Sequence, residues 1–185
     1  APLQYLRAPW NAPQAFTISG WFNAATVAVS TQEDILSAYS EAIMIALVNT
    51  TCYMRMPSGS GASNIQYTGT ISAGTWNSFT MIFQTNGLCS SYLNNILLGS
   101  FMNSGGFGTN INSGGIVFGT NDNLSLLYPF NGSLDDIRIF PYAVSPVGPN
   151  LYFPFENSTA DVVSGATVTV TGTPTYVAGL STGSA

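Results

Sequence analysis

The chain has 185 residues, of which 45% are hydrophobic and 12% aromatic, and its formal net charge is −5. This apolar content excludes an intrinsically disordered chain, and the length suits one all-β domain. Only 6% of the residues are charged, against about 25% in an ordinary globular domain. Three arginines and no lysine are too few to neutralise a phosphate backbone, so we expect no nucleic-acid partner.

The sequence predicts neither membrane insertion nor a lipid anchor. Its longest apolar run, Ala42 to Val48, is far shorter than the roughly 20 residues that cross a bilayer. Ala1 is preceded by no initiator Met or signal peptide, which indicates a processed mature protein or a piece of a longer one. Ser, Thr, Asn and Gly are abundant and charged residues are scarce, a composition that is common in extracellular proteins. We therefore expect an extracellular location, or one on a cell or virion surface.

Short β-rich runs separated by Gly, Pro and Asn turns follow one another along the chain, as in sandwiches and barrels. The predicted strands are Phe16–Phe22, Ile43–Val48, Cys52–Met56, Ser78–Gln84, Ser91–Leu98, Ile116–Gly119 and Ile137–Phe140. One helix competes, because Ser30 and Glu33 resemble a capping box ahead of Asp34 to Ser40. Ile43–Val48 is apolar on both faces, which favours a central strand.

Pro146 and Pro149 mark a boundary, after which the chain looks like a fresh beginning at Leu151 to Glu156. Ala166 to Thr171 then alternates small apolar residues with threonines, which is typical of a half-buried strand. We therefore divide the chain into a body, residues 1–150, and a C-terminal strand segment, residues 151–185.

Five stretches, taken in order, resemble the LamG-like jelly-roll family, a concanavalin A-like sandwich. They are Phe16–Phe22 (similar to FTISxW), Gly74–Thr80 (GTWHHVA), Tyr92–Ile96 (YVNGV), Gly115–Gly119 (xIxIG) and Phe130–Phe140 (FxGxIDDVRIY). In the fourth position of YVNGV, Asn95 replaces Gly, and Asn tolerates the left-handed φ of a hairpin. The resemblance implies an all-β, antiparallel two-sheet jelly roll in which Trp21 and Trp76 are core anchors.

The frame of the resemblance is circularly shifted. Family modules begin with a segment similar to LYFPFDG and DxSG, whereas here Leu151–Phe155 and Asp161–Gly165 come last. Gly179–Ala185 would lead into Ala1–Leu6 as in the family's GxxGxALxF passage. Three explanations stay open: residues 151–185 complete their own sandwich, or that of the next subunit, or the chain is one period of a tandem array.

We favour donation to the next subunit, because head-to-tail contacts that do not close build filaments. The absence of Lys leaves edge strands undefended against such pairing. The expected function is a non-enzymatic structural subunit of a fibre or surface appendage whose partner is itself. The predicted donor residues are Leu151, Tyr152, Phe153, Phe155, Val168 and Val170.

No catalytic residue is expected. The chain has no His, which excludes Ser-His-Asp, Cys-His and imidazole-metal chemistry. A glycosidase would need two acidic residues across a cleft, and none of the eight acids forms the ExDxxE pattern of similar folds. No cofactor is required. Asp135 and Asp136 resemble structural anchors of the closing strand, and Asp122, Asp135 and Asp136 are candidate Ca²⁺ ligands, with Asn121 and Asn123 beside Asp122.

Cys52 and Cys89 lie in separate predicted strands and are expected to form one disulfide, the alternative being two buried thiols.

The alternative function is a carbohydrate-binding, lectin-like adhesion module that is a circularly permuted monomer. Aromatic platforms beside hydrogen-bonding side chains hold glycans in such sites. Because Trp21 and Trp76 are assigned to the core, the platform candidates are Trp10, Tyr67 and Tyr128. The chain also has four candidate N-glycosylation sequons, at Asn49, Asn123, Asn131 and Asn157.

Overall fold

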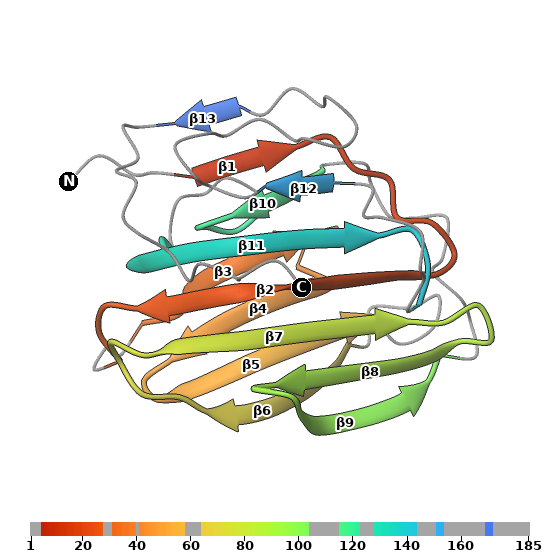
Figure 1. Ribbon diagram of the computed structural model, residues 1–185, viewed down its shortest axis with the longest axis horizontal. Coiled ribbons are helices and arrows are strands. Elements are labelled where there is room, and N and C mark those ends of the chain that lie inside the picture. Colours follow the sequence, from red (N-terminus) through yellow and green to blue (C-terminus); the bar gives the residue numbers. More distant parts are fainter. Residues whose placement is uncertain are drawn as a thin grey trace, which may run out of the picture.

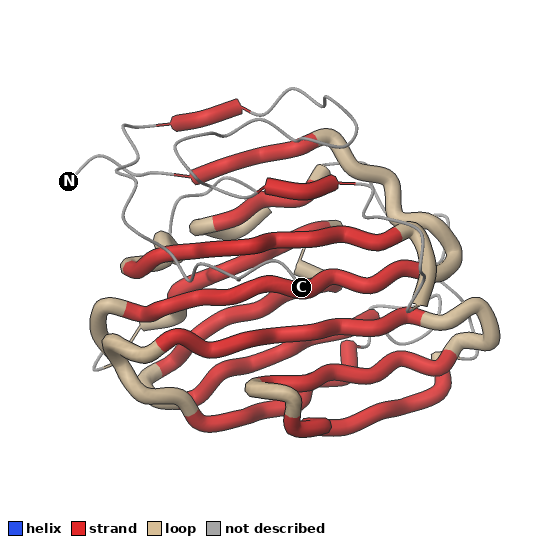
Figure 2. Tube along the Cα trace, in the orientation of Figure 1, coloured by secondary structure: helices blue, strands red, loops and turns tan. Residues whose placement is uncertain are grey.

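The computed structural model describes residues 5–27, 31–39, 41–57, 64–103, 115–122, 128–143, 151–153 and 169–171 (Figure 2). Within these ranges every regular element is a β-strand, and every pair of neighbouring strands is antiparallel. The strands form two facing sheets (Figure 1). The predicted two-sheet, antiparallel jelly-roll fold is confirmed.

Each sheet is built from strands that come from separate parts of the chain. In the described residues the seven-stranded sheet has the order β13 (Thr169–Thr171), β1 (Tyr5–Ala8), β10 (Ile116–Phe118), β3 (Glu33–Ala38), β4 (Ile43–Val48), β5 (Thr51–Pro57) and β6 (Asn64–Thr70). The six-stranded sheet has the order β12 (Leu151–Phe153), β11 (Gly132–Phe140), β2 (Phe16–Ala24), β7 (Trp76–Phe83), β8 (Leu88–Leu93) and β9 (Ile96–Met102).

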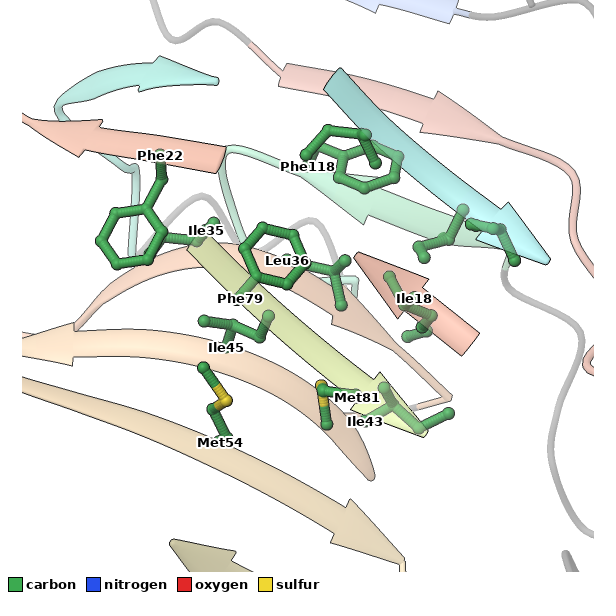
Figure 3. Packing of buried hydrophobic residues seen from close by; sticks show 14 of the residues in the cluster. Ile18, Phe22, Ile35, Leu36, Ile43, Ile45, Met54, Phe79, Met81 and Phe118 are labelled. Atoms are coloured by element: carbon green, nitrogen blue, oxygen red, sulfur yellow. The ribbon is translucent and has the colours of Figure 1, made fainter. Parts of the chain in front are cut away.

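The hydrophobic core lies between the sheets and follows from alternation along the strands. In β7 every second residue is buried, and in β2 Ile18 and Phe22 point inward (Figure 3). Phe16 stacks on Phe83 with ring centroids 4.2 Å apart. Each fully buried side chain of this size contributes about 1.5–3 kcal/mol of transfer free energy. The core thus binds the two sheets into one unit.

Strands β3 and β10 are buried along their whole length, and β4 from Ile43 to Leu47. The prediction that Ile43–Val48 is a central strand is therefore confirmed. The competing helix considered over Asp34 to Ser40 does not form, because Glu33–Ala38 is strand β3, paired with β10 and β4. Ile35 and Leu36 are both fully buried, and sheet pairing overrides the local capping pattern.

The hairpin between β8 and β9 turns at Asn94 and Asn95, whose φ angles are +52° and +63°. This is the left-handed conformation expected where Asn replaces Gly. The predicted strand Ser91–Leu98 is thus two strands joined by a tight turn. Strands β1, β3 and β6 had no counterpart among the predicted strands.

The C-terminal segment contributes one strand to each sheet on the same side of the sandwich (Figure 1). Strand β12 pairs with β11, placing Tyr152 opposite Arg138, and β13 pairs with β1, placing Val170 opposite Leu6. In this single chain both strands therefore occupy edges of their own sandwich. Phe155 and Val168 lie outside the described residues.

Candidate functional site

The outer face of the six-stranded sheet carries two tryptophans. In β2, Phe22 and Ile18 enter the core while Trp21 points to the opposite face, and Trp76 does the same in β7. Both rings are half-buried, so their assignment to the core is wrong. The backbone pairing places Trp21 opposite Ser78 and Trp76 opposite Asn23. The two rings are diagonal neighbours, which are about 7–8 Å apart on antiparallel strands.

The remaining residues of this face are mostly neutral hydrogen-bonding groups. Tyr92 of β8 lies opposite Thr80 of β7, which in turn pairs with Ser19 of β2. Strands β2, β7 and β8 contain no charged residue. We call the surface formed by Ser19, Trp21, Asn23, Trp76, Ser78, Thr80 and Tyr92 the aromatic face. Aromatic rings beside hydroxyl and amide groups suit uncharged ligands that offer both CH and OH groups.

The three platform residues expected from the sequence are not brought together on this face. Trp10 belongs to the core, with 7% of its surface exposed and its ring 5.1 Å from that of Phe16, so its prediction as an exposed platform is wrong. Tyr67 of β6 is half-buried and donates a hydrogen bond to the carbonyl oxygen of Ser100 at 2.8 Å. Tyr128 is half-buried next to β3, where its carbonyl oxygen accepts the amide of Asp34.

A buried acidic group lies on the seven-stranded sheet, which the sequence did not single out. Asp34 has no exposed surface; its Oδ1 accepts Gln32 Nε2 at 2.7 Å, and its Oδ2 has no hydrogen-bond partner. Burial, aided by the charges of Glu41 and Asp122, raises the pKa of this carboxyl to about 7, although Gln32 and Arg55 oppose the shift. A fully buried carboxyl is not accessible to a substrate, and burial makes ionisation of Asp34 costly to the folded state.

The three candidate Ca²⁺ ligands lie on different sheets. Asp122 follows β10, where its Oδ1 accepts Ser37 Oγ at 3.1 Å and the Glu41 amide at 3.2 Å. Asp135 and Asp136 lie in β11 of the other sheet, and Asp136 pairs with Arg138 at 2.9 Å. Within the described ranges no three His, Cys, Asp or Glu residues form a metal-binding group. The structure does not bring the three ligands together, and calcium binding by any one of them stays a prediction.

Asp136 has an evident structural contact. Its φ of +51° coincides with the register shift that interrupts the β11–β2 pairing between Asp135 and Arg138. Its Oδ1 accepts a hydrogen bond from Nε of Arg138 and forms an ion pair with Nη2 of the same guanidinium. This ion pair lies at the bulge, and the role of Asp135 and Asp136 as anchors of the closing strand stays a prediction.

The predicted disulfide is absent, and Cys52 and Cys89 are both free and buried. Cys52 of β5 lies opposite Gly69, and a Cβ built on Gly69 would lie 2.6 Å from Leu93 of β8. Cys89 precedes Leu93 by four residues on β8, about 13 Å along a strand. A disulfide needs Cα atoms about 4.4–6.8 Å apart. The thiols are therefore at different ends of the sandwich, and the disulfide prediction is wrong.

Two of the four predicted sequons lie in described positions that favour modification. Asn49 is exposed in the turn after β4, and Asn131 is exposed just before β11. Asn123 and Asn157 lie outside the described residues. Glycosylation at any of the four stays a prediction.

The sequence model of the concanavalin A-like lectin/glucanases superfamily, in its laminin G form, matches residues 4–147. The chain belongs to this superfamily. The match ends before residue 151, so it covers the body and leaves out β12 and β13. No curated protein is significantly similar to the chain in sequence. Within the described residues, no helix is long and apolar enough to cross a membrane.

Solved structures share the fold at low sequence identity. A "putative carbohydrate binding protein" from Bacteroides ovatus has a TM-score of 0.67 at 13% identity over 95% of this chain, which spans only 59% of that protein. A heptameric SAP-like pentraxin from Limulus polyphemus has 0.55 at 16%, covering 92% of this chain and 89% of its own. The CBM40 of a Ruminococcus gnavus IT-sialidase has 0.57 at 14%, covering 73% and 80%. At these identities the likeness establishes the fold alone.

Proposed function

We propose that the chain is a non-enzymatic, extracellular structural subunit that assembles head to tail when the segment 151–185 of one copy completes the sandwich of the next. The observation that carries the proposal is the position of β12 and β13. Each is an edge strand, they lie on the same side of the two sheets, and both come from the segment that stands out of frame with the family. A segment with only edge positions can leave its body without dividing a sheet.

The pairing partners of β12 and β13 support exchange between copies. β11 and β1 would offer the same edges to the segment of a neighbour as they offer to their own. Exchange of identical elements conserves every contact within each sandwich and gains a link between subunits. When the segment passes always to the next copy, the contacts are heterologous and the assembly does not close. The result is a filament of jelly rolls.

Electron microscopy of the purified chain, with size-exclusion chromatography in mild buffer, tests this assembly. Filaments with a repeat of about one domain length support strand donation or a tandem array. Denaturing electrophoresis separates the two, because donated strands release single chains of 19.5 kDa. Uniform monomers under all buffers would reject the proposal and leave a self-completed jelly roll.

A second candidate function is glycan binding, favoured by the aromatic face on β2, β7 and β8. Trp21, Trp76 and Tyr92 offer rings for stacking, and Asn23 and Ser78 lie beside them as hydrogen-bonding groups. One similar solved structure is named a "putative carbohydrate binding protein", and the CBM40 was also solved bound to alpha2,3 sialyllactose, which agrees with this use of the fold. The alternative is thus a lectin-like adhesion module.

Binding to a panel of neutral and sialylated oligosaccharides, measured by glycan array and calorimetry, tests the second candidate. Trp21→Ala should lower the affinity at least tenfold, since stacking of a ring on a glycan is lost. The matched control is Tyr53→Ala, which removes a half-buried ring from the seven-stranded sheet. Equal loss in both variants, or binding unchanged by Trp21→Ala, would exclude the aromatic face as the site.

A further inference from the structure

The sulfur-bearing residues of the chain differ sharply in their access to solvent. The five methionines and two cysteines all lie in described residues. Met102, the last residue of the edge strand β9, is 59% exposed. The others have only 0–1% of their surface exposed, and they are Met44, Met54, Met56, Met81, Cys52 and Cys89. A reagent dissolved in water therefore meets Met102 and is kept from the rest.

The four other methionines are enclosed by the packing of the sheets. Met54 and Met81 lie in the core between the two sheets (Figure 3), and Met56 belongs to the same cluster. Met44 is 1% exposed, and its Sδ accepts a hydrogen bond from Gln32 Nε2 at 3.5 Å. An oxidant reaches these sulfur atoms only when the strands around them open. In the folded chain they are therefore protected.

Met102 combines a fixed backbone with an open side chain. In the described residues β9 is the last strand of the six-stranded sheet (Figure 1). Met102 pairs with Leu88 of β8, and the amide of the next residue, Asn103, donates to the Gly87 carbonyl oxygen at 2.8 Å. These contacts hold the end of β9 in place on one side. An oxygen atom added to the exposed side chain needs no space inside the packing, so the fold accommodates it.

We propose that Met102 is the oxidation site of the folded chain, where hydrogen peroxide converts the thioether into a sulfoxide. One oxygen of the peroxide forms a bond to Sδ of Met102 while the O–O bond breaks. The sulfur loses two electrons and the peroxide gains them, and the second oxygen leaves as water with both protons. The product is polar and chiral, whereas the thioether is apolar.

Oxidation of Met102 changes the polarity of the β9 edge. Ile96, Leu97 and Met102 are 68%, 51% and 59% exposed, and β9 contains no charged residue, so its surface is neutral and largely apolar. A sulfoxide adds a strong hydrogen-bond acceptor to this edge, and methionine sulfoxide reductases reverse the change. Met102 thus makes the polarity of one edge strand sensitive to oxidants. This role is independent of strand donation by residues 151–185.

Treatment of the native full chain with hydrogen peroxide, followed by peptide mapping with mass spectrometry, tests the site. Met102 should take up one oxygen at least about tenfold faster than any other methionine, because susceptibility follows exposure. In urea, where the packing is lost, all five methionines should react at similar rates. Met102→Leu is the matched control, since it keeps an apolar side chain of similar size and should take up no oxygen in the native state.

The properties of the oxidised chain complete the test. Its melting temperature should change by less than about 2 °C, because the modified side chain lies outside the packing. Its retention on a hydrophobic-interaction column should fall, and methionine sulfoxide reductase should restore both the mass and the retention. Native oxidation of a buried methionine as fast as that of Met102, or no oxygen on Met102, rejects the site. Unchanged retention, or a marked loss of melting temperature, rejects a change confined to the β9 edge.

Discussion

At the scale of single residues, Trp10 shows why aromatic residues cannot be assigned to a surface by elimination. Its ring lies between those of Phe16 and Tyr39, with centroids 5.1 and 5.4 Å away. We expect Trp10→Ala to lower the free energy of unfolding by about 3–5 kcal/mol, as for other large core truncations. Trp21→Ala, on the outer face, should cost less than half as much. Urea denaturation of both variants measures the difference, and equal losses would contradict the inward assignment.

Asp34 gives the stability a definite dependence on pH. Because burial raises its pKa from 3.8 to about 7, the folded chain keeps a proton that the unfolded chain has released between these values. The stability is therefore greatest at the acidic end and falls as the pH rises through this window, by up to about 1.4 kcal/mol per unit.

The variant Asp34→Asn isolates this effect. It should be more stable than the natural chain at about pH 8 and should flatten the slope between about pH 4 and pH 7. Burial also raises the pKa of Glu33, which leaves a smaller slope of the same sign. Urea denaturation across the range checks this, and a slope unchanged by Asp34→Asn would contradict it.

The two thiols should be unreactive in the folded chain. Burial raises the pKa of Cys52 to about 12 and that of Cys89 to about 11, so neither forms a thiolate near neutral pH. A thiol reagent should label neither residue in the native protein and both in urea, and a reductant should not change the melting temperature. Mass spectrometry of the labelled chains counts the thiols. A melting temperature that falls when a reductant is added would instead support a disulfide between Cys52 and Cys89.

At the scale of elements, β2 is held against both of its neighbours at Gly20. A Cβ there would collide with Ile137 of β11 and approach Phe79 of β7 to 3.0 Å. Gly20→Ala should destabilise the chain by about 1–3 kcal/mol through overpacking. Ser19→Ala, one position earlier on the outer face, is the control and should stay within about 0.5 kcal/mol. Thermal unfolding of the two variants gives the comparison, and similar melting temperatures would contradict the close packing.

The strands predicted correctly from the sequence are those whose apolar pattern and flanking turn residues are both visible within a short stretch of the chain. Phe16–Phe22 and Ile116–Gly119 needed only β-branched or aromatic residues between turns. β3 was missed because a capping pattern at Ser30 and Glu33 imitates a helix start, and only pairing with β10 and β4 decides against it. The aromatic face was missed because the family resemblance assigned Trp21 and Trp76 to the core, whereas the alternation along β2 and β7 turns both side chains outward.

The acidic and thiol predictions failed for a related reason. Asp122 and Asp135 were grouped as Ca²⁺ ligands because both are acidic, but they belong to different sheets. Their separation along the sequence does not predict the distance between them in space. The positions of Cys52 and Cys89 along the sandwich depend on the registers of β5 with β6 and of β8 with its neighbours. Registers over long sequence separations arise from the packed core.

At the scale of the whole molecule, charge is distributed unevenly over the strands. The charged residues of the described strands lie on β1, β3, β5 and β11, and none lies on β6 to β9. The two sides of the molecule are thereby suited to different contacts. One side carries the edges completed by β12 and β13, and the other carries the neutral β9 surface.

A rearranged chain tests whether residues 151–185 act within one molecule or between two. In a permuted chain that places 151–185 ahead of residue 1, residue 185 is followed by residue 1, and the segment leads into β1, the strand with which β13 pairs. We expect this connection to favour self-completion over donation, and therefore a monomer near 19.5 kDa by sedimentation where the natural order yields filaments. The permuted chain should melt at a temperature equal to or above that of the natural chain. If both orders give monomers of equal stability, the segment completes its own sandwich and strand donation is excluded; if both give filaments, the links between subunits lie elsewhere on the surface.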